Sequence, residues 1–143
     1  MVEAKPKEGR EMYKNILVLL DCSPVDDVIL RHIRELAKIH SSKVCLFHVI
    51  HAHTLDQRRF MLERAQRCLE DGAEILRKAG IDVILSTAEG EPVPEVLKKI
   101  ETSECDLVAM ATHGHRGIAD FVLGSVSNAV KHHIKKPLLL IRG

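Results

Sequence analysis

The chain has 143 residues, a net charge of +1, 45% hydrophobic residues and 29% charged residues. This length allows one domain with a substantial core and is too short for two domains. The near-zero net charge and the aromatic content of 3% speak against a basic nucleic-acid surface and against an aromatic platform for stacked bases.

The N-terminal segment and the cysteines indicate the cellular location of the protein. Residues 1–12 are polar and lack the apolar segment of a signal peptide. No stretch reaches the roughly 18–20 apolar residues that a membrane span needs. We therefore expect a polar leader over residues 1–12, one globular domain over residues 13–143, a cytoplasmic location and no membrane partner. The four cysteines form no C-x-x-C pair, which favours free thiols over disulfides or a zinc site: Cys22, Cys45, Cys68 and Cys105.

Apolar runs that suit buried strands alternate with amphipathic helical stretches along the whole chain. The run over residues 16–20 stops at Asp21 and predicts a strand covered on both faces. Ser23 and Pro24 are expected to open a helix, with Ser23 as the N-cap, that continues to about His40. The later elements are predicted as strands over 44–50, 81–86, 106–111 and 138–141 and helices over 55–79, from Gly90 to about 100, and 125–134.

This alternation predicts an α/β fold: a doubly wound, five-stranded parallel sheet of Rossmann type with helices on both faces. Ligands of such sheets bind beyond the carboxyl ends of the strands. Asp21, the residues after Val49 and the segment Ala111–Ser125 all lie at such ends.

The segment after the fourth predicted strand has the order of an anion site. The strand leads into a loop with Gly114 and Gly117, and the loop leads into a helix expected to start at Gly124 and Ser125. The backbone of a glycine-bearing loop can approach a phosphate closely, and a helix start offers unpaired N–H groups.

Four short motifs carry a resemblance to a known family. They are Asp21-Cys22-Ser23 after the first strand, His48-Val49 in the second strand, Gly90-Glu91-Pro92, and Gly114 followed by nine residues and Gly124-Ser125. On these residues the chain resembles the universal stress protein family, nucleotide-binding branch, over nearly all of its length after Tyr13. The family has a fold like that of the adenine-nucleotide α-hydrolases. Two positions depart from its pattern, because Ala111 replaces the first motif glycine and Cys22 replaces a more usual glycine.

The resemblance implies a site for ATP, with Mg²⁺ held through the phosphates and by no protein ligand. The Asp21 carboxylate would accept a hydrogen bond from a ribose hydroxyl, and the backbone of Val49 would contact the adenine edge. Residues 110–116 would surround the ribose and phosphates, with Arg116 a better phosphate partner than the histidines because it is always charged. The nucleotide-binding residues implied in this way are Leu19, Asp21, Val49, Met110, Ala111, His113, Gly114, His115, Arg116, Gly124, Ser125 and Val126.

Each of these residues also has a purely structural interpretation. Asp21 could cap the first helix or its turn, Gly117 could serve a positive-φ turn, and Ser125 could be an N-cap without any ligand. Their convergence on neighbouring strand ends favours the ligand interpretation. Ala111 would be strained by roughly 1–2 kcal/mol if its position requires positive φ. We expect instead that Ala111 stays extended at the strand end. Cys22 is a lesser concern for nucleotide binding, because it follows the contacting Asp21.

Histidines and the C-terminal basic residues are expected to be structural. The histidine sets do not have the spacing of a zinc site. The basic residues after the last helix should complement its dipole: Lys131, His132, His133, Lys135 and Lys136.

The favoured function is therefore a stress-response regulator that binds ATP with Mg²⁺ and signals as a homodimer. The chain has neither the Walker motif nor the serine-hydrolase elbow, so an enzyme is disfavoured, although slow ATP hydrolysis or autophosphorylation is conceivable. The alternative is an interaction module that binds no nucleotide. A phosphotransferase or nucleotide hydrolase is a third option, and a flavin carrier is disfavoured by the few aromatics.

The last predicted strand, Leu138–Ile141, suggests how two copies could pair. In the strand order that the resemblance implies, this apolar strand lies at a sheet edge, and an open edge invites pairing with another chain. We expect Leu140→Lys to yield monomers.

Overall fold

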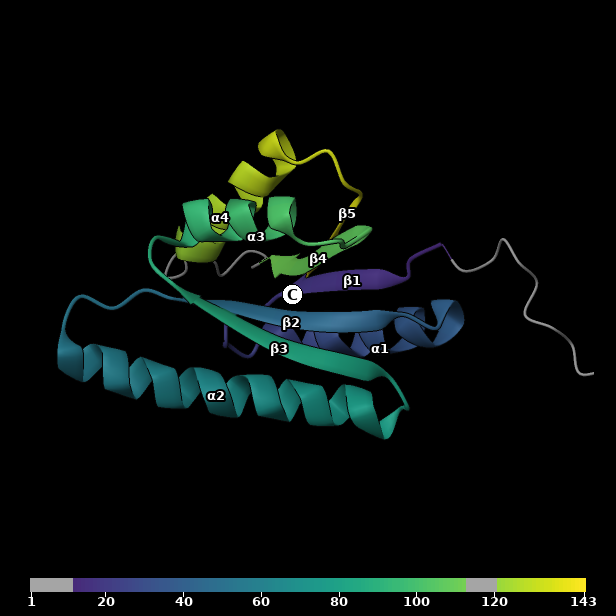
Figure 1. Cartoon of the computed structure of the whole chain (residues 1–143), viewed down its shortest axis with the longest axis horizontal. Helices are drawn as coiled ribbons and strands as arrows, with labels where there is room; N and C mark the ends of the chain where they lie inside the picture. Colours follow the sequence, from purple (N-terminus) through teal and green to yellow (C-terminus); the bar gives the residue numbers. More distant parts are fainter. Residues whose placement is uncertain (1–11, 113–120) are drawn as a thin grey trace, which may run out of the picture.

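The computed structural model describes residues 12–112 and 121–143 (Figure 1). The predicted alternation of strands and helices is confirmed. The elements are β1 (Asn15–Leu19), α1 (Asp26–His40), β2 (Lys43–Ile50), α2 (Leu55–Lys78), β3 (Asp82–Glu89), α3 (Pro92–Thr102), β4 (Leu107–Thr112), α4 (Phe121–His133) and β5 (Leu138–Arg142).

The strands form the predicted parallel sheet, with five strands in the order β3-β2-β1-β4-β5. The chain winds outward from β1 to β3 and then returns to place β4 on the other side of β1. The strand order therefore reverses between β1 and β4, and this is where open α/β sheets bind their ligands.

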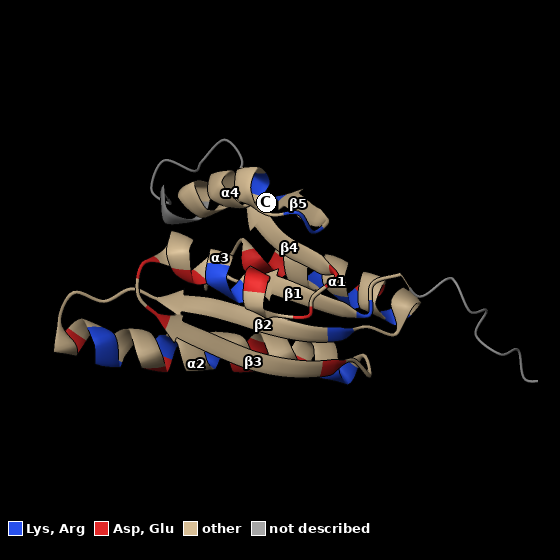
Figure 2. Ribbon diagram, turned by 45° about the horizontal axis from the view of Figure 1, so that its top comes forward, with Lys and Arg blue, Asp and Glu red and all other residues tan. Residues whose placement is uncertain are grey.

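Two helices cover each face of the sheet: α1 and α2 lie on one side and α3 and α4 on the other (Figure 1). Because successive side chains of a strand point to opposite faces, β1 contributes to both cores. Ile16 and Val18 pack in the cluster with residues of α1 and α2, whereas Leu17 and Leu19 pack in the cluster with residues of α3 and α4. The central strands β1 and β4 carry no charged residue, which matches their cover on both faces (Figure 2).

Both predicted helix starts that involve serine are wrong. Helix α1 begins at Asp26, and Ser23 stands before a turn in which its carbonyl accepts the N–H of Asp26 at 3.0 Å. The Ser23 hydroxyl has no hydrogen-bond partner among the described residues. The Asp26 carboxylate accepts the N–H groups of Asp21 and Cys22. Helix α4 begins at Phe121, a full turn before Ser125, since the apolar residues before Gly124 continue the helix.

One residue of the basic cluster also has a different task from the predicted one. The Lys136 ammonium donates to the carbonyls of Ile100 and Ser103, at 2.9 and 2.7 Å. These carbonyls belong to the C-terminal end of α3, so Lys136 caps a neighbouring helix and not the helix that precedes it. Among the described helices, none combines the length and the apolar character that a membrane span requires.

Candidate functional site

A pocket of about 240 Å³ lies at the carboxyl ends of β1 and β2. Its walls come from the β1–α1 loop, β2, α2, α3 and α4. The lining residues are Leu19, Leu20, Asp21, Cys22, Phe47, His48, Val49, His51, Met61, Arg64, Ala65, Pro92, Val96 and Val126. The pocket therefore lies at the carboxyl ends of the strands, where such sheets bind ligands, on the β2 side of the β1–β4 reversal.

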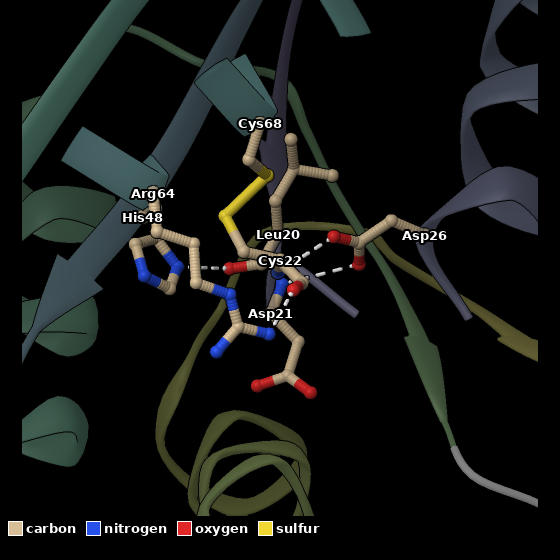
Figure 3. Close-up of a disulfide and its surroundings, with 7 residues drawn as sticks. All are labelled: Leu20, Asp21, Cys22, Asp26, His48, Arg64 and Cys68. Atoms are coloured by element: carbon tan, nitrogen blue, oxygen red, sulfur yellow. Dashed lines mark hydrogen bonds between the residues drawn. A yellow bond between two sulfur atoms is a disulfide. The ribbon is translucent and has the colours of Figure 1, made fainter. Parts of the chain in front are cut away.

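The β1–α1 loop over residues 20–22 is held by its own hydrogen bonds. The N–H groups of Asp21 and Cys22 donate to the two carboxylate oxygens of Asp26, at 3.1 and 2.7 Å (Figure 3). The Leu20 carbonyl accepts from His48 Nδ1 at 2.8 Å, so Nδ1 carries the proton. The Asp21 carboxylate points away from Asp26, as Figure 3 shows, and lines the pocket.

Asp26 is the buried acid of this site, with 6% of its surface exposed. Burial raises the pKa of Asp26 from 3.8 to about 6, although the N–H groups of Asp21 and Cys22 work against this increase. The carboxyl group therefore titrates near neutral pH while it fixes the loop that presents Asp21.

The loop also carries a disulfide, which corrects the prediction of free thiols. Cys22 is bonded to Cys68 of α2 across 46 residues of sequence, with a Cα–Cα distance of 5.7 Å (Figure 3). Only the packing of α2 beside the loop brings the two together, and their sequence spacing gives no sign of it. Cys45 and Cys105 are free, as predicted.

Backbone strain occurs at Cys22 and not at Ala111. Cys22 has a φ of 58°, the left-handed conformation, which costs a non-glycine residue roughly 1–2 kcal/mol. Glycine, the more usual residue at this position, would adopt the conformation without that strain. Ala111 lies in β4 and pairs with Ile141 of β5. Its φ is not positive, so its backbone stays extended as predicted.

Arg64 of α2 is a pocket residue that sequence reasoning missed. Its guanidinium donates to the Cys22 carbonyl at 2.9 Å. The residue lines the pocket and lies one helical turn before Cys68 in α2. No motif contains it. Two pocket histidines have structural contacts, since His48 binds the Leu20 carbonyl and His51 Nδ1 lies 3.1 Å from the Gly90 carbonyl.

The structure brings only part of the implied nucleotide set into the pocket. Leu19, Asp21, Val49 and Val126 line it. Met110 and Ala111 are buried in β4, where they pack in the cores on opposite faces of the sheet. The implied residues His113, Gly114, His115 and Arg116, together with Gly117, lie outside the described residues.

Gly124 and Ser125 are exposed and do not line the pocket. Because α4 begins at Phe121, they lie inside the helix and not at its start. Only the N–H groups of the first turn of a helix are unpaired, so the N–H groups of Ser125 and Val126 belong to the helix's own hydrogen bonds.

Comparison with known proteins agrees with this fold. The model of the universal stress protein family matches residues 12–142. The chain belongs to the universal stress protein family. Among its relatives, the universal stress protein MJ0577 of Methanocaldococcus jannaschii is 24% identical, with 92% of this chain and 96% of the relative covered. Universal stress protein A homolog 2 of Coxiella burnetii is 27% identical, with coverage of 91% and 95%.

Solved structures of universal stress proteins share the same architecture. That of MJ0577 superposes with a TM-score of 0.79 at 26% identity, covering 92% of this chain and 97% of the other. A universal stress protein from Archaeoglobus fulgidus in complex with dAMP gives a TM-score of 0.71 at 21% identity, with coverage of 91% and 98%. Another family member, in complex with cAMP, also gives 0.71, at 19% identity and with coverage of 91% and 97%.

Proposed function

We propose that this universal stress protein binds an adenine nucleotide in the pocket at the ends of β1 and β2. The observation that carries the proposal is that Asp21 and Val49, from the ends of the neighbouring strands β1 and β2, line one pocket at the carboxyl edge of the sheet. The adenine nucleotides bound by other members of the family support the same ligand class.

The walls of the pocket suit the parts of such a ligand. Asp21 would accept a ribose hydroxyl in a charge-assisted hydrogen bond, and the Val49 backbone would contact the adenine edge. Leu19, Met61 and Val126 offer apolar surface to the base and sugar. We propose ATP as the nucleotide, with Mg²⁺ held by phosphate oxygens, which are the ligands that this cation prefers.

The protein would act through its bound state, in the cytoplasm, as a regulator and not as an enzyme. Slow hydrolysis of ATP to ADP and phosphate, or transfer of its γ-phosphoryl group to the Ser125 hydroxyl with release of ADP, would be incidental to this role.

Asp21→Ala tests the proposed site. We expect it to weaken binding of ATP with Mg²⁺ about tenfold or more, since hydrogen bonds to charged groups contribute about 1.5–3 kcal/mol. Titration calorimetry, with and without a thiol reductant, measures the affinity. The matched control is Asp27→Ala, which removes the same charge from an exposed position of α1 outside the pocket. Wild-type protein that binds no ATP, ADP, AMP or cAMP in either condition would overturn the proposal.

Ala111→Gly tests whether the missing motif glycine limits binding. The Ala111 methyl group packs in the core with residues of α1 and α2 and does not reach the pocket. We therefore expect the nucleotide affinity to stay within about threefold of wild type. The free energy of unfolding should fall by roughly 1–2 kcal/mol, because glycine weakens a strand and a buried methyl group is lost. A tenfold gain in affinity would show that Ala111 impairs the site.

One observation favours a second candidate function, an interaction module that binds no nucleotide. The start of α4 at Phe121 removes the helix N-terminus from Gly124 and Ser125, where the family motif would place phosphates. The calorimetric titration separates the two candidates.

We also propose that the protein forms a homodimer through β5, which lies at the edge of the sheet. The Pro137 carbonyl accepts the N–H of Val108, and the Gly143 N–H donates to the Thr112 carbonyl, so both residues are hydrogen-bonded to β4. Since every second residue of a strand faces the same neighbour, the backbone N–H and carbonyl groups of Leu139 and Ile141 face β4 as well. The N–H groups of Leu138, Leu140 and Arg142 therefore face outward, where a second β5 could pair.

Leu140→Pro should yield monomers, because it removes an outward N–H group without removing a bond to β4. Leu140→Ala is the matched control: it also trims this half-buried side chain but retains the N–H group, so it should remain dimeric. Light scattering after size-exclusion chromatography measures the mass of each variant. If Leu140→Pro still forms dimers, the interface lies elsewhere.

A further inference from the structure

We propose that the Cys22–Cys68 pair is a thiol–disulfide modification site that controls access to the pocket. Its substrates are dithiol reductants, which open the bond, and small-molecule disulfides, which close it. The proposal rests on the proposed function, because it concerns regulation of the same nucleotide pocket.

The bond joins two walls of that pocket. Cys22 belongs to the β1–α1 loop and lines the pocket directly after Asp21, whereas Cys68 belongs to α2. Arg64 and Met61, on the preceding turns of α2, also line the pocket. In the disulfide form the Cα atoms of the pair are held 5.7 Å apart, and the Arg64 guanidinium lies across the loop on the Cys22 carbonyl at 2.9 Å (Figure 3).

The pair is within reach of small thiols, and the other cysteines are poorly suited to the reaction. Cys22 and Cys68 are both half-buried, so part of each is exposed to solvent. Cys105 is buried, and burial raises the pKa of Cys45 above its usual value, which lowers its thiolate fraction. Thiol chemistry should therefore be selective for the pair.

Thiol–disulfide exchange accounts for both directions. A thiolate of the reductant attacks one sulfur of the pair, and the S–S electron pair leaves on the other cysteine, which takes up a proton. The second thiol of the reductant then attacks the mixed disulfide and releases the first cysteine as a thiol. The protein gains two thiols, and the reductant becomes a disulfide. Oxidation by a small-molecule disulfide reverses these steps.

The disulfide form is the closed state of the pocket. Its volume of about 240 Å³ lies just under the roughly 300–1,000 Å³ of typical ligand pockets. Reduction removes the covalent link between the loop and α2 and lets Cys22 leave the left-handed conformation. We therefore expect the reduced protein to bind nucleotide at least tenfold more tightly.

The same atoms could suggest a metal site. The ligand atoms of Cys22, Asp26 and Cys68 lie within 4.8 Å of one another. The exchange site is the stronger interpretation, because both Asp26 oxygens already accept backbone N–H groups and the two sulfurs are bonded to each other.

The test measures the thiol state and the ATP affinity on the same full-length samples. Alkylation and mass spectrometry should find the pair opened in native protein by dithiothreitol and closed again by oxidised glutathione. Calorimetry with ATP and Mg²⁺ should give an affinity at least tenfold higher for the reduced sample. Cys68→Ser should bind as the reduced protein does in both conditions. Cys45→Ser, which removes a thiol outside the pair, should keep the wild-type redox response.

The possible failures can be told apart. The redox proposal would be overturned, with nucleotide binding left intact, if the two states bound ATP equally or the oxidised state bound it more tightly. It would also be overturned if dithiothreitol did not open the disulfide in the native protein. Reduced protein that retains one equivalent of added Zn²⁺ and then resists oxidation would overturn it in favour of a metal site. If neither state binds ATP, ADP, AMP or cAMP, the proposed function itself fails.

Discussion

Loss of the Cys22–Cys68 bond is expected to lower the free energy of unfolding by about 4 kcal/mol. A cross-link restricts the unfolded chain, and a bridge across 46 residues corresponds to about 4 kcal/mol at 25 °C by the chain-entropy relation. The loop of the folded protein keeps other contacts, because the Asp26 carboxylate and Arg64 still bind it. We therefore expect the reduced protein to remain folded with a lower stability.

Urea unfolding of the oxidised and the reduced protein measures this difference. The double variant Cys22→Ser/Cys68→Ser should match the reduced protein and show no response to reductant. Cys45→Ser should keep the full difference. A loss below about 1 kcal/mol on reduction would show that the loop and α2 hold together in the unfolded chain without the bond, or that strain at Cys22 offsets the gain.

The Asp26 carboxyl group should make the protein less stable as the pH rises from about 4 to about 7. Its pKa is about 6 in the folded protein against 3.8 as the ordinary value, with burial as the main cause. The folded state therefore binds more protons than the unfolded chain between these values, and stability falls where that is so. The contribution is complete below pH 4 and lost above pH 6. At about 1.4 kcal/mol for each pKa unit, the loss is about 3 kcal/mol.

Asp26→Asn isolates this effect, because it cannot ionise. The variant should be less stable than wild type at pH 4, since its amide nitrogen replaces an oxygen that accepts a backbone N–H group. As the pH rises to 7, the gap should shift by about 3 kcal/mol in favour of the variant. Asp27→Asn, on the exposed side of α1, should follow the wild-type profile. Parallel profiles for wild type and Asp26→Asn would contradict the prediction.

Most of the fold could be predicted because periodicity along the sequence reflects burial. The uninterrupted apolar run of β1 requires a cover on both faces, and its residues do alternate between the two cores. The placement of Asp21 and Val49 at one pocket also followed from the strand ends.

The errors concern contacts that local sequence does not determine. Ser23 and Ser125 have the composition of N-caps, yet each helix start depends on what competes for its backbone groups. Other errors concern residues whose bonding partners are brought near only by the packing of helices: Cys68, Arg64 and Lys136. No spacing in the chain encodes these distances, so neither the disulfide nor the arginine in the pocket wall could be anticipated.

The cap that Lys136 places on α3 has a mechanical consequence. Pro92 and Val96 of this helix lie in the pocket wall, while its other end is tied to a lysine just before β5. Helix α3 therefore connects the wall of the pocket at its first turns to the segment before the edge strand at its last turn. The lysine makes this connection by hydrogen bonds that cross from one element to the next.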